Sequence, residues 1–197
     1  MKTKILPLML LFAVMTGLAK TTDAAVAANS NNTVLNDIKA INKIEVRGNV
    51  QLFISDMLPE QVTVYNKYYA QNALVQSKNG VLRISSYNTV KLVVWVSSQN
   101  LQSVSAYDNA EIRSFGDVAK IQFNIDLHDN AIAKLKFDAH SVRATLRDNA
   151  TAEFSGRIDE FGMNRNTNSV VINNGLSVGR NTENKLIETG KEVLAGA

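Results

Sequence analysis

The chain has 197 residues, of which 45% are apolar and 20% are charged, and its formal net charge is +3. This length and composition fit one folded domain of ordinary size and exclude a disordered or collagen-like chain. There is no cysteine, which excludes a disulfide scaffold, a thiolate metal site, a cysteine nucleophile and a lipid-modified cysteine. The two histidines, His128 and His140, argue against a multi-histidine metal centre.

Residues 1–28 have the pattern of a signal peptide with its cleavage region. Lys2 and Lys4 precede an apolar stretch from Ile5 to Leu18, and small residues follow. The stretch is shorter than the ~20 residues that span a bilayer, so we expect no membrane span after cleavage. The alternative is a buried N-terminal helix. Cleavage would also remove positive charge, so the net charge gives no reason to expect a nucleic-acid partner. We expect an exported protein in the periplasm, at the outer-membrane surface or outside the cell.

Residues 29–40 are predicted to be a linker, because the chain from Thr21 to Asn36 is rich in Ala, Asn and Thr and lacks periodicity. After it, apolar residues recur at every second position, which is typical of half-buried strands. Asn79-Gly80 predicts a hairpin turn. The strands predicted in this half are Lys43–Ser55 with a bend at Gly48-Asn49, Gln61–Tyr65, Ala73–Gln76, Val81–Ser85, and Thr89–Ser97 with Val90, Leu92 and Val94 on one face and Trp95 on the other.

The second half repeats the tripeptide Asp-Asn-Ala at residues 108–110, 129–131 and 148–150, with a degenerate copy at 167–169. A period of about twenty residues fits a β-solenoid coil, because helical repeats need about 33 residues or more. Asp and Asn tolerate left-handed backbone conformations and cap neighbouring amides. Stacking would place equivalent positions ~4.8 Å apart, so we expect an amide ladder of Asn109, Asn130, Asn149 and Asn168. The predicted fold is all-β: a β-solenoid of about four stacked coils preceded by a short antiparallel or mixed sheet.

These features resemble the family of bacterial envelope proteins described as putative auto-transporter adhesin, head GIN domain. The resemblance covers roughly Ile41 to Gly175 and implies a domain at 41–178, followed at 179–197 by an irregular tail or last partial coil. The family has glycine where this chain has Asn at the corners, and Asn is the best other residue at positive φ. Adhesion is implied only by analogy. The matching segments are Val46–Val50, Gly80–Ser85, Lys91–Val96 and the three Asp-Asn-Ala corners.

Two kinds of chemical site were weighed against the repeat. A column of Asp108, Asp129 and Asp148 could bind Ca²⁺, but turn capping explains the same residues with ordinary loop chemistry. A polysaccharide lyase or glycosidase needs clustered carboxylates on one long face, and no such cluster is apparent. His128 is expected at an exposed corner and His140 in a loop. The residues considered for the enzyme were Asp126, Asp138, Glu153, Asp159 and Glu160, with Arg143, Arg147 and Arg157 as a stripe on one face.

Tyr65, Tyr68 and Tyr69 form the densest aromatic cluster and are the predicted recognition patch. The alternative is that they cover the end of the solenoid or are ordinary surface, and Trp95 is expected to cover an exposed face or a coil end. The predicted function is an exported, non-catalytic, adhesin-like scaffold without a cofactor, with an unknown glycan or envelope partner. A polysaccharide-active β-helix enzyme and a periplasmic structural protein without ligand are the alternatives.

Overall fold

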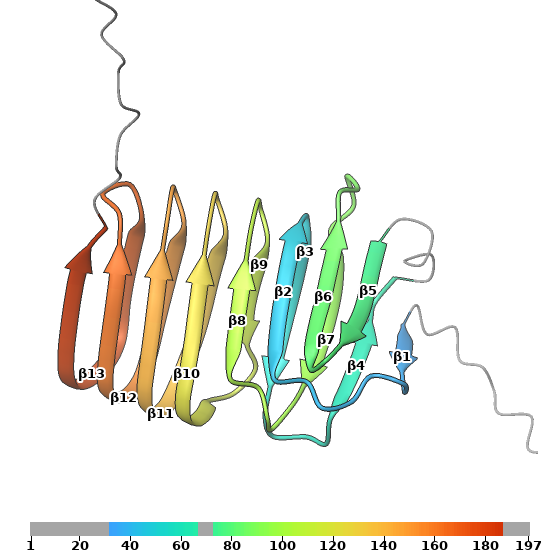
Figure 1. Cartoon of the computed structure of the whole chain (residues 1–197), viewed down its shortest axis with the longest axis horizontal. Helices are drawn as coiled ribbons and strands as arrows, with labels where there is room; N and C mark the ends of the chain where they lie inside the picture. The colour runs from blue at the N-terminus through green and yellow to red at the C-terminus, as the bar shows by residue number, and fades with distance from the viewer. Residues whose placement is uncertain (1–31, 67–72, 187–197) are drawn as a thin grey trace, which may run out of the picture. The chain divides into compact units, whose positions relative to one another are not determined.

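The computed structural model describes residues 32–66 and 73–186, and these residues form one mixed β-sheet (Figure 1). This confirms the all-β prediction. Within the described ranges there is no helix long and apolar enough to cross a membrane. The strands are β1 (Thr33–Leu35), β2 (Lys43–Gly48), β3 (Val50–Ser55), β4 (Gln61–Val64), β5 (Ala73–Lys78), β6 (Val81–Ser86), β7 (Leu92–Ser97), β8 (Ser103–Ala106), β9 (Glu111–Ser114), β10 (Val118–Leu127), β11 (Ile132–Leu146), β12 (Thr151–Arg165) and β13 (Val170–Lys185).

From β8 onward, successive passes of the chain pair in parallel. β10 lies between β8 and β11, and β12 lies between β11 and β13. Leu127 on β10 is beside Ala106 on β8 and Leu146 on β11, so neighbouring passes are offset by the same spacing as the tripeptide repeat. The first part of β11 pairs with β9 and its second part pairs with β10. Each long strand therefore contributes to both rows of strands in Figure 1.

The N-terminal part is arranged differently, because its order in space departs from its order in sequence. β2 lies in parallel between β6 and β8, and β3 lies in parallel between β7 and β9. Beyond them, β5 pairs antiparallel with β6, and β4 pairs antiparallel with β7 and β1. The predicted hairpin is confirmed between β5 and β6: Asn79 and Gly80 have φ of 52° and 77°, as a type I′ turn requires.

Three details differ from the sequence predictions. Part of the predicted linker forms β1, where Leu35 pairs with Val62 on β4; three residues are too few to show an alternation. Val90 does not share the buried face of Leu92 and Val94, since it is 69% exposed and β7 begins only at Leu92. Residues 179–185, expected in an irregular tail or a last partial coil, continue β13 to Lys185, and polar side chains such as Asn181 hide the strand pattern there.

Phenylalanine side chains fill the core of the repeated part. The rings of Phe123, Phe137, Phe154 and Phe161 form successive pairs with centroids 5.6 to 6.0 Å apart. At the equivalent positions of β13, beside Phe154 and Phe161, the chain has Asn173 and Asn181. The row of core phenylalanines therefore ends at β12, although Val171, Leu176 and Val178 of β13 still pack against the core.

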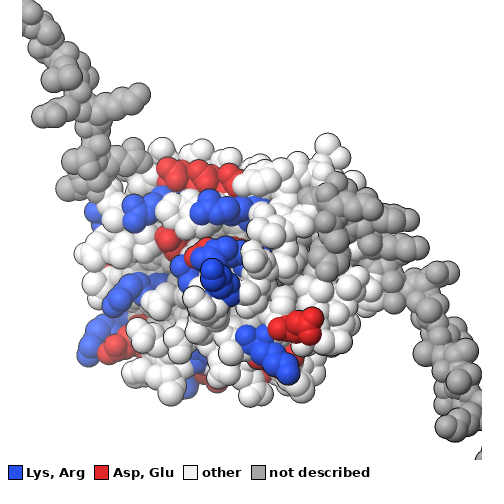
Figure 2. Space-filling model, turned by 45° about the vertical axis from the view of Figure 1, so that its right-hand side comes forward, with Lys and Arg blue, Asp and Glu red and all other residues white. Residues whose placement is uncertain are grey.

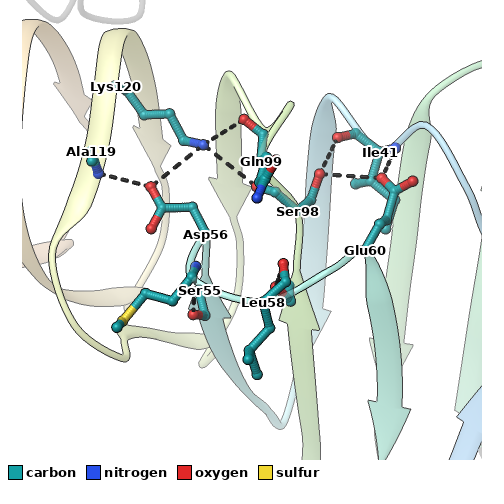
Figure 3. A network of polar contacts seen from close by, with 11 residues as sticks. Ile41, Ser55, Asp56, Leu58, Glu60, Ser98, Gln99, Ala119 and Lys120 are labelled. Atoms are coloured by element: carbon teal, nitrogen blue, oxygen red, sulfur yellow. Dashed lines mark hydrogen bonds and ion pairs between the residues drawn. The ribbon is translucent and has the colours of Figure 1, made fainter.

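A partly exposed polar network joins the loops beyond the ends of β3 and β7 (Figure 3). The carboxylate of Asp56 accepts a hydrogen bond from the Ala119 backbone amide at 2.8 Å and lies 3.6 Å from the ammonium group of Lys120. Lys120 also donates to the carbonyl oxygen of Gln99 at 2.7 Å. The Glu60 carboxylate accepts two further backbone amides just before β2, each at 2.7 Å. These contacts hold the N-terminal part against the start of β10.

Candidate binding face

The three Asp-Asn-Ala corners lie in one column, where β8, β10 and β11 end, at the opposite ends of the strands from this network. In each corner the Asp has positive φ, between 56° and 60°, whereas the following Asn does not. The resemblance to the family, which has glycine at the Asn position, predicted positive φ at the Asn, and that prediction was wrong. Of the expected amide ladder, the described residues show one contact, from Asn149 Nδ2 to Asn130 Oδ1 at 3.4 Å.

The aspartate side chains link each corner to the preceding one. Asp108 accepts a hydrogen bond from the Gly48 amide at 3.0 Å, Asp129 from the Asp108 amide at 2.9 Å, and Asp148 from the Asp129 amide at 3.1 Å. The carboxylates therefore cap turns. Among the described residues, no group of three His, Cys, Asp or Glu side chains could hold a metal ion.

Next to this column, aromatic and basic side chains stack along the sheet. The guanidinium carbon of Arg47 lies 3.8 Å from the centre of the Tyr107 ring, and His128 stacks on Tyr107 with centroids 4.6 Å apart. The Nε2 atom of His128 is 3.1 Å from the Asp126 carboxylate. His128 was predicted to be an exposed corner residue, but its side chain is only 22% exposed. His140, predicted in a loop, lies within β11 with its Nδ1 atom 3.1 Å from Asp159.

The outward positions of β2, β8, β10, β11, β12 and β13 carry mainly polar side chains because inward and outward residues alternate along each strand. The pairing registers align these positions into rows that cross the strands. One row is Lys43, Ser103, Asn124, Arg143, Gly162 and Thr182, and the next is Glu45, Ser105, Asp126, Thr145, Asn164 and Asn184.

Three neighbouring depressions on this face share lining residues. Their volumes are about 420, 340 and 340 Å³; the first two share Asn124, and the second and third share Arg143. The third is open at Gly162, where an added Cβ would meet no atom within 4 Å. We call these three depressions together the polar groove. Its principal polar lining residues are Gln102, Gln122, Asn124, Lys43, Ser103, Ser105, Asp126, Arg143, Thr145, Arg147, Glu160, Asn164, Arg180, Thr182 and Asn184.

Most charged residues of the polar groove have a partner of opposite charge. Lys43 is 2.9 Å from Glu45, and Arg180 is 3.1 Å from Glu160. The hydrogen bond from Lys43, together with the nearby charges, lowers the pKa of Glu45 despite its partial burial. Arg143 and Arg147 are exposed and have no acidic partner within the described part of the chain. In Figure 2, groups of basic side chains lie over the described strands with acidic groups beside some of them.

The carboxylates considered for an enzyme do not form a set around one point. Each has its own basic side chain as a neighbour, and the predicted arginine stripe divides, because Arg143 and Arg147 line the polar groove while Arg157 pairs with Asp138. The pairs are Asp126 with His128, Asp138 with Arg157, Glu153 with Lys134, Asp159 with His140, and Glu160 with Arg180.

Of the predicted aromatic patch, only Tyr65 falls in the described residues, where it is 47% exposed; Tyr68 and Tyr69 lie outside them. The structure shows another cluster on a different set of strands. Trp95 lies between Phe53 and Phe115, with ring centroids 5.8 and 4.7 Å away. The sequence analysis missed this cluster because Phe53 and Trp95 meet through the parallel pairing of β3 and β7, which no local pattern reveals.

Comparison with known families identifies the chain's class. Residues 40–184 match the family model described as putative auto-transporter adhesin, head GIN domain. The match covers most of the chain, so the chain belongs to this family, as its resemblance implied.

Solved structures show the same fold at low sequence identity. A putative adhesin from Parabacteroides merdae is 13% identical, with 80% of this chain and 78% of that chain covered and a TM-score of 0.63. A putative adhesin from Parabacteroides distasonis is 15% identical, with coverage of 78% and 77% and a TM-score of 0.57. A putative lipid binding protein from the same species is 13% identical, with coverage of 80% and 79% and a TM-score of 0.55. The comparison with curated proteins gave no match.

Proposed function

We propose that this chain is an exported, non-catalytic, adhesin-like scaffold of the bacterial envelope whose polar groove contacts a glycan polymer. The observation that carries the proposal is the polar groove itself. It is shallow and crosses several strands, and most of the side chains that line it are amides, hydroxyls or charged groups. Sugars present many hydroxyl groups, so a surface that offers many hydrogen-bond donors and acceptors in a row suits them.

The scaffold part of the proposal is a β-solenoid of about four stacked coils. Parallel pairing of β8, β10, β11, β12 and β13, offset by one repeat at each step, supports it. The aspartate hydrogen bonds between successive corners add support. A stack of this kind keeps equivalent side chains in rows, which is what a binding surface for a repeating polymer requires.

Export and lack of catalysis are supported by separate observations. The signal-peptide pattern of residues 1–28 supports export to the periplasm, the outer-membrane surface or the medium. The separate pairing of each carboxylate with its own basic side chain argues against a lyase or glycosidase, whose two carboxylates must face one substrate bond. Incubation with envelope and acidic polysaccharides should release no products, and product release would favour the enzyme. Protease added to intact cells should degrade the protein if it is exposed on the surface.

A glycan panel tests binding through the groove. We expect the wild-type chain to bind at least one glycan, and Gly162→Tyr to weaken that binding because the new ring fills the open part of the groove. Val170→Tyr is the matched control, since Val170 is 49% exposed and lies outside the groove. Both variants should keep the wild-type melting temperature. Absence of binding to any glycan, matrix or envelope component would contradict the proposal.

We propose Tyr65, Tyr68 and Tyr69 as a second recognition patch, separate from the polar groove. Aromatic rings are favoured at binding surfaces, and Tyr65 is half exposed at the end of β4. Tyr65→Ala should weaken binding to the glycan found in the panel without changing stability by more than about 0.5 kcal/mol. Unchanged affinity would remove Tyr65 from the contact surface.

A further inference from the structure

Two arginines in the polar groove are available for a ligand. Arg143 and Arg147 are both exposed, and no acidic side chain in the described residues pairs with either. By contrast, Lys43 and Arg180 in the same groove each have a carboxylate within 4 Å. A guanidinium group without an internal partner keeps its five donors free for an external anion.

The two arginines also point the same way. Arg143 and Thr145 are successive outward positions of β11, Arg147 directly follows the end of that strand at Leu146, and both arginines line the same depression. Alternate residues on a strand are ~6.8 Å apart, so the two Cα atoms are separated by ~13.5 Å. A ligand that reaches both must therefore be extended and carry more than one negative group.

The surroundings select among anionic polymers. Hydroxyl and amide groups of Ser103, Ser105 and Asn124 lie beside the arginines in the same depression. The nearby Tyr107 ring is not free to stack on a nucleic-acid base, because Arg47 covers one side of it and His128 stacks on it as well. Asp126 also lines the depression and would repel a polymer as densely charged as polyphosphate.

From these observations we infer that the polar groove binds an acidic polysaccharide, with carboxylate groups of the polymer held by Arg143 and Arg147. The inference rests on the proposed function and narrows its ligand class. Guanidinium and carboxylate groups form paired, charge-assisted hydrogen bonds, and a polymer that lies along β11 could place one carboxylate at each arginine. Sugar hydroxyls would then meet the polar side chains between the two arginines.

The test compares polygalacturonate with the same polymer after its carboxyl groups have been reduced to alcohols, by calorimetry with the full chain. We expect polygalacturonate to bind and the reduced polymer to bind at least about tenfold more weakly, with a marked loss of affinity at high salt. The double variant Arg143→Gln/Arg147→Gln should lose about tenfold in affinity for polygalacturonate. The double variant Lys136→Gln/Arg157→Gln removes the same charge outside the groove and should bind as the wild type does. Thermal unfolding confirms that both variants are folded.

The outcomes separate this inference from the proposed function. Equal binding of both polymers, or loss of affinity in both double variants alike, would overturn the inference and leave the proposed function standing. Binding of neutral glycans but not polygalacturonate would do the same. Binding only to anionic lipid vesicles or polyphosphate would overturn it in favour of a phosphate-binding surface. If no glycan binds, acidic or neutral, the proposed function fails too.

Discussion

The two parts of the sheet achieve parallel pairing in different ways. In the C-terminal part, from β8 to β13, each pass of chain lies beside the next in sequence, and corners of the same composition connect them. In the N-terminal part, β2 and β3 are inserted between strands that come later in the chain. Beyond them, β4 pairs antiparallel with β7 and β5 pairs antiparallel with β6. The first arrangement follows from a repeat of about twenty residues, whereas the second depends on contacts between distant segments.

The two ends of the sheet also differ, one lying in the part without the repeat and the other in the repeated part. At the N-terminal end, β5 and the β4–β1 pair cover the parallel strands with antiparallel ones. At the C-terminal end, β13 continues the parallel pairing and replaces core phenylalanines by asparagines. One end is thus closed by a change of strand direction and the other by a change of side-chain polarity. The predictions below test that contrast.

The largest effect is expected in the phenylalanine core of the C-terminal part. Phe154→Ala should lower the free energy of unfolding by about 3–5 kcal/mol, because a fully buried ring leaves a cavity. Asn173→Ala, at the paired position of β13, should change it by less than about 0.5 kcal/mol. Urea unfolding of both variants measures the difference. Similar effects for the two would show that the phenylalanine row continues energetically into β13.

A smaller loss of stability is expected when Gly48, in the first corner, is replaced by the Asp of the later corners. Gly48 precedes Asp108 in the corner column and also has positive φ, but a Cβ there would lie 2.2 Å from the Ser86 carbonyl oxygen. Gly48→Asp should therefore cost about 3 kcal/mol, since the backbone of β6 must move. Asp108→Gly should cost about 1 kcal/mol, because it loses the hydrogen bonds from the Gly48 amide and the Tyr87 hydroxyl but relieves positive φ. Urea unfolding measures both losses of stability. If Gly48→Asp loses less than Asp108→Gly, the close approach of Ser86 does not distinguish the first corner from the later ones.

The smallest loss of stability is expected at Glu111, a residue that contacts side chains of both parts. Glu111 on β9 is 8% exposed and accepts hydrogen bonds from Arg113 at 2.6 Å and Gln51 at 3.2 Å, with Lys91 at 3.4 Å. Burial raises the pKa of Glu111, but Arg113 and Lys91 together lower it further, so the net pKa is below the ordinary value.

A lowered pKa in the folded state means that the unfolded chain takes up the proton first as the pH falls. The stabilisation by Glu111 should be present above the ordinary pKa of a glutamate and be lost as the pH falls through the lower folded value. Glu111→Gln should be less stable than wild type at pH 7 by about 1 kcal/mol, and the gap should close as the pH approaches 3. Urea unfolding between pH 7 and 3 measures it, and a gap that stays constant would contradict this role.

The part of the fold that sequence could predict is the part that repeats. Alternation and the Asp-Asn-Ala spacing predicted the strands from Ile121 to Phe154, because there the partner of each residue lies about one period away. The insertion of β2 between β6 and β8 leaves no local signal. Neither does the contact between Phe53 and Trp95, since these residues belong to different passes of the chain.

The sequence could predict individual residues of the candidate site but not how they are grouped. The sequence singled out Arg143, Arg147 and Arg157 together, but only the register between β11 and β12 shows that the first two flank the polar groove while Arg157 pairs with Asp138. Gly162 carried no signal at all. It matters because it lacks a side chain in a row where its neighbours have one, and that becomes visible only when the strands lie side by side.

The most direct test of the account is the dependence of affinity on ligand length. Arg143 and Arg147 are ~13.5 Å apart along β11. Affinity for oligogalacturonates measured by calorimetry should rise with each added sugar until the oligomer spans this distance, and then level off. A dimer that binds as tightly as a long oligomer would contradict a ligand that reaches both arginines.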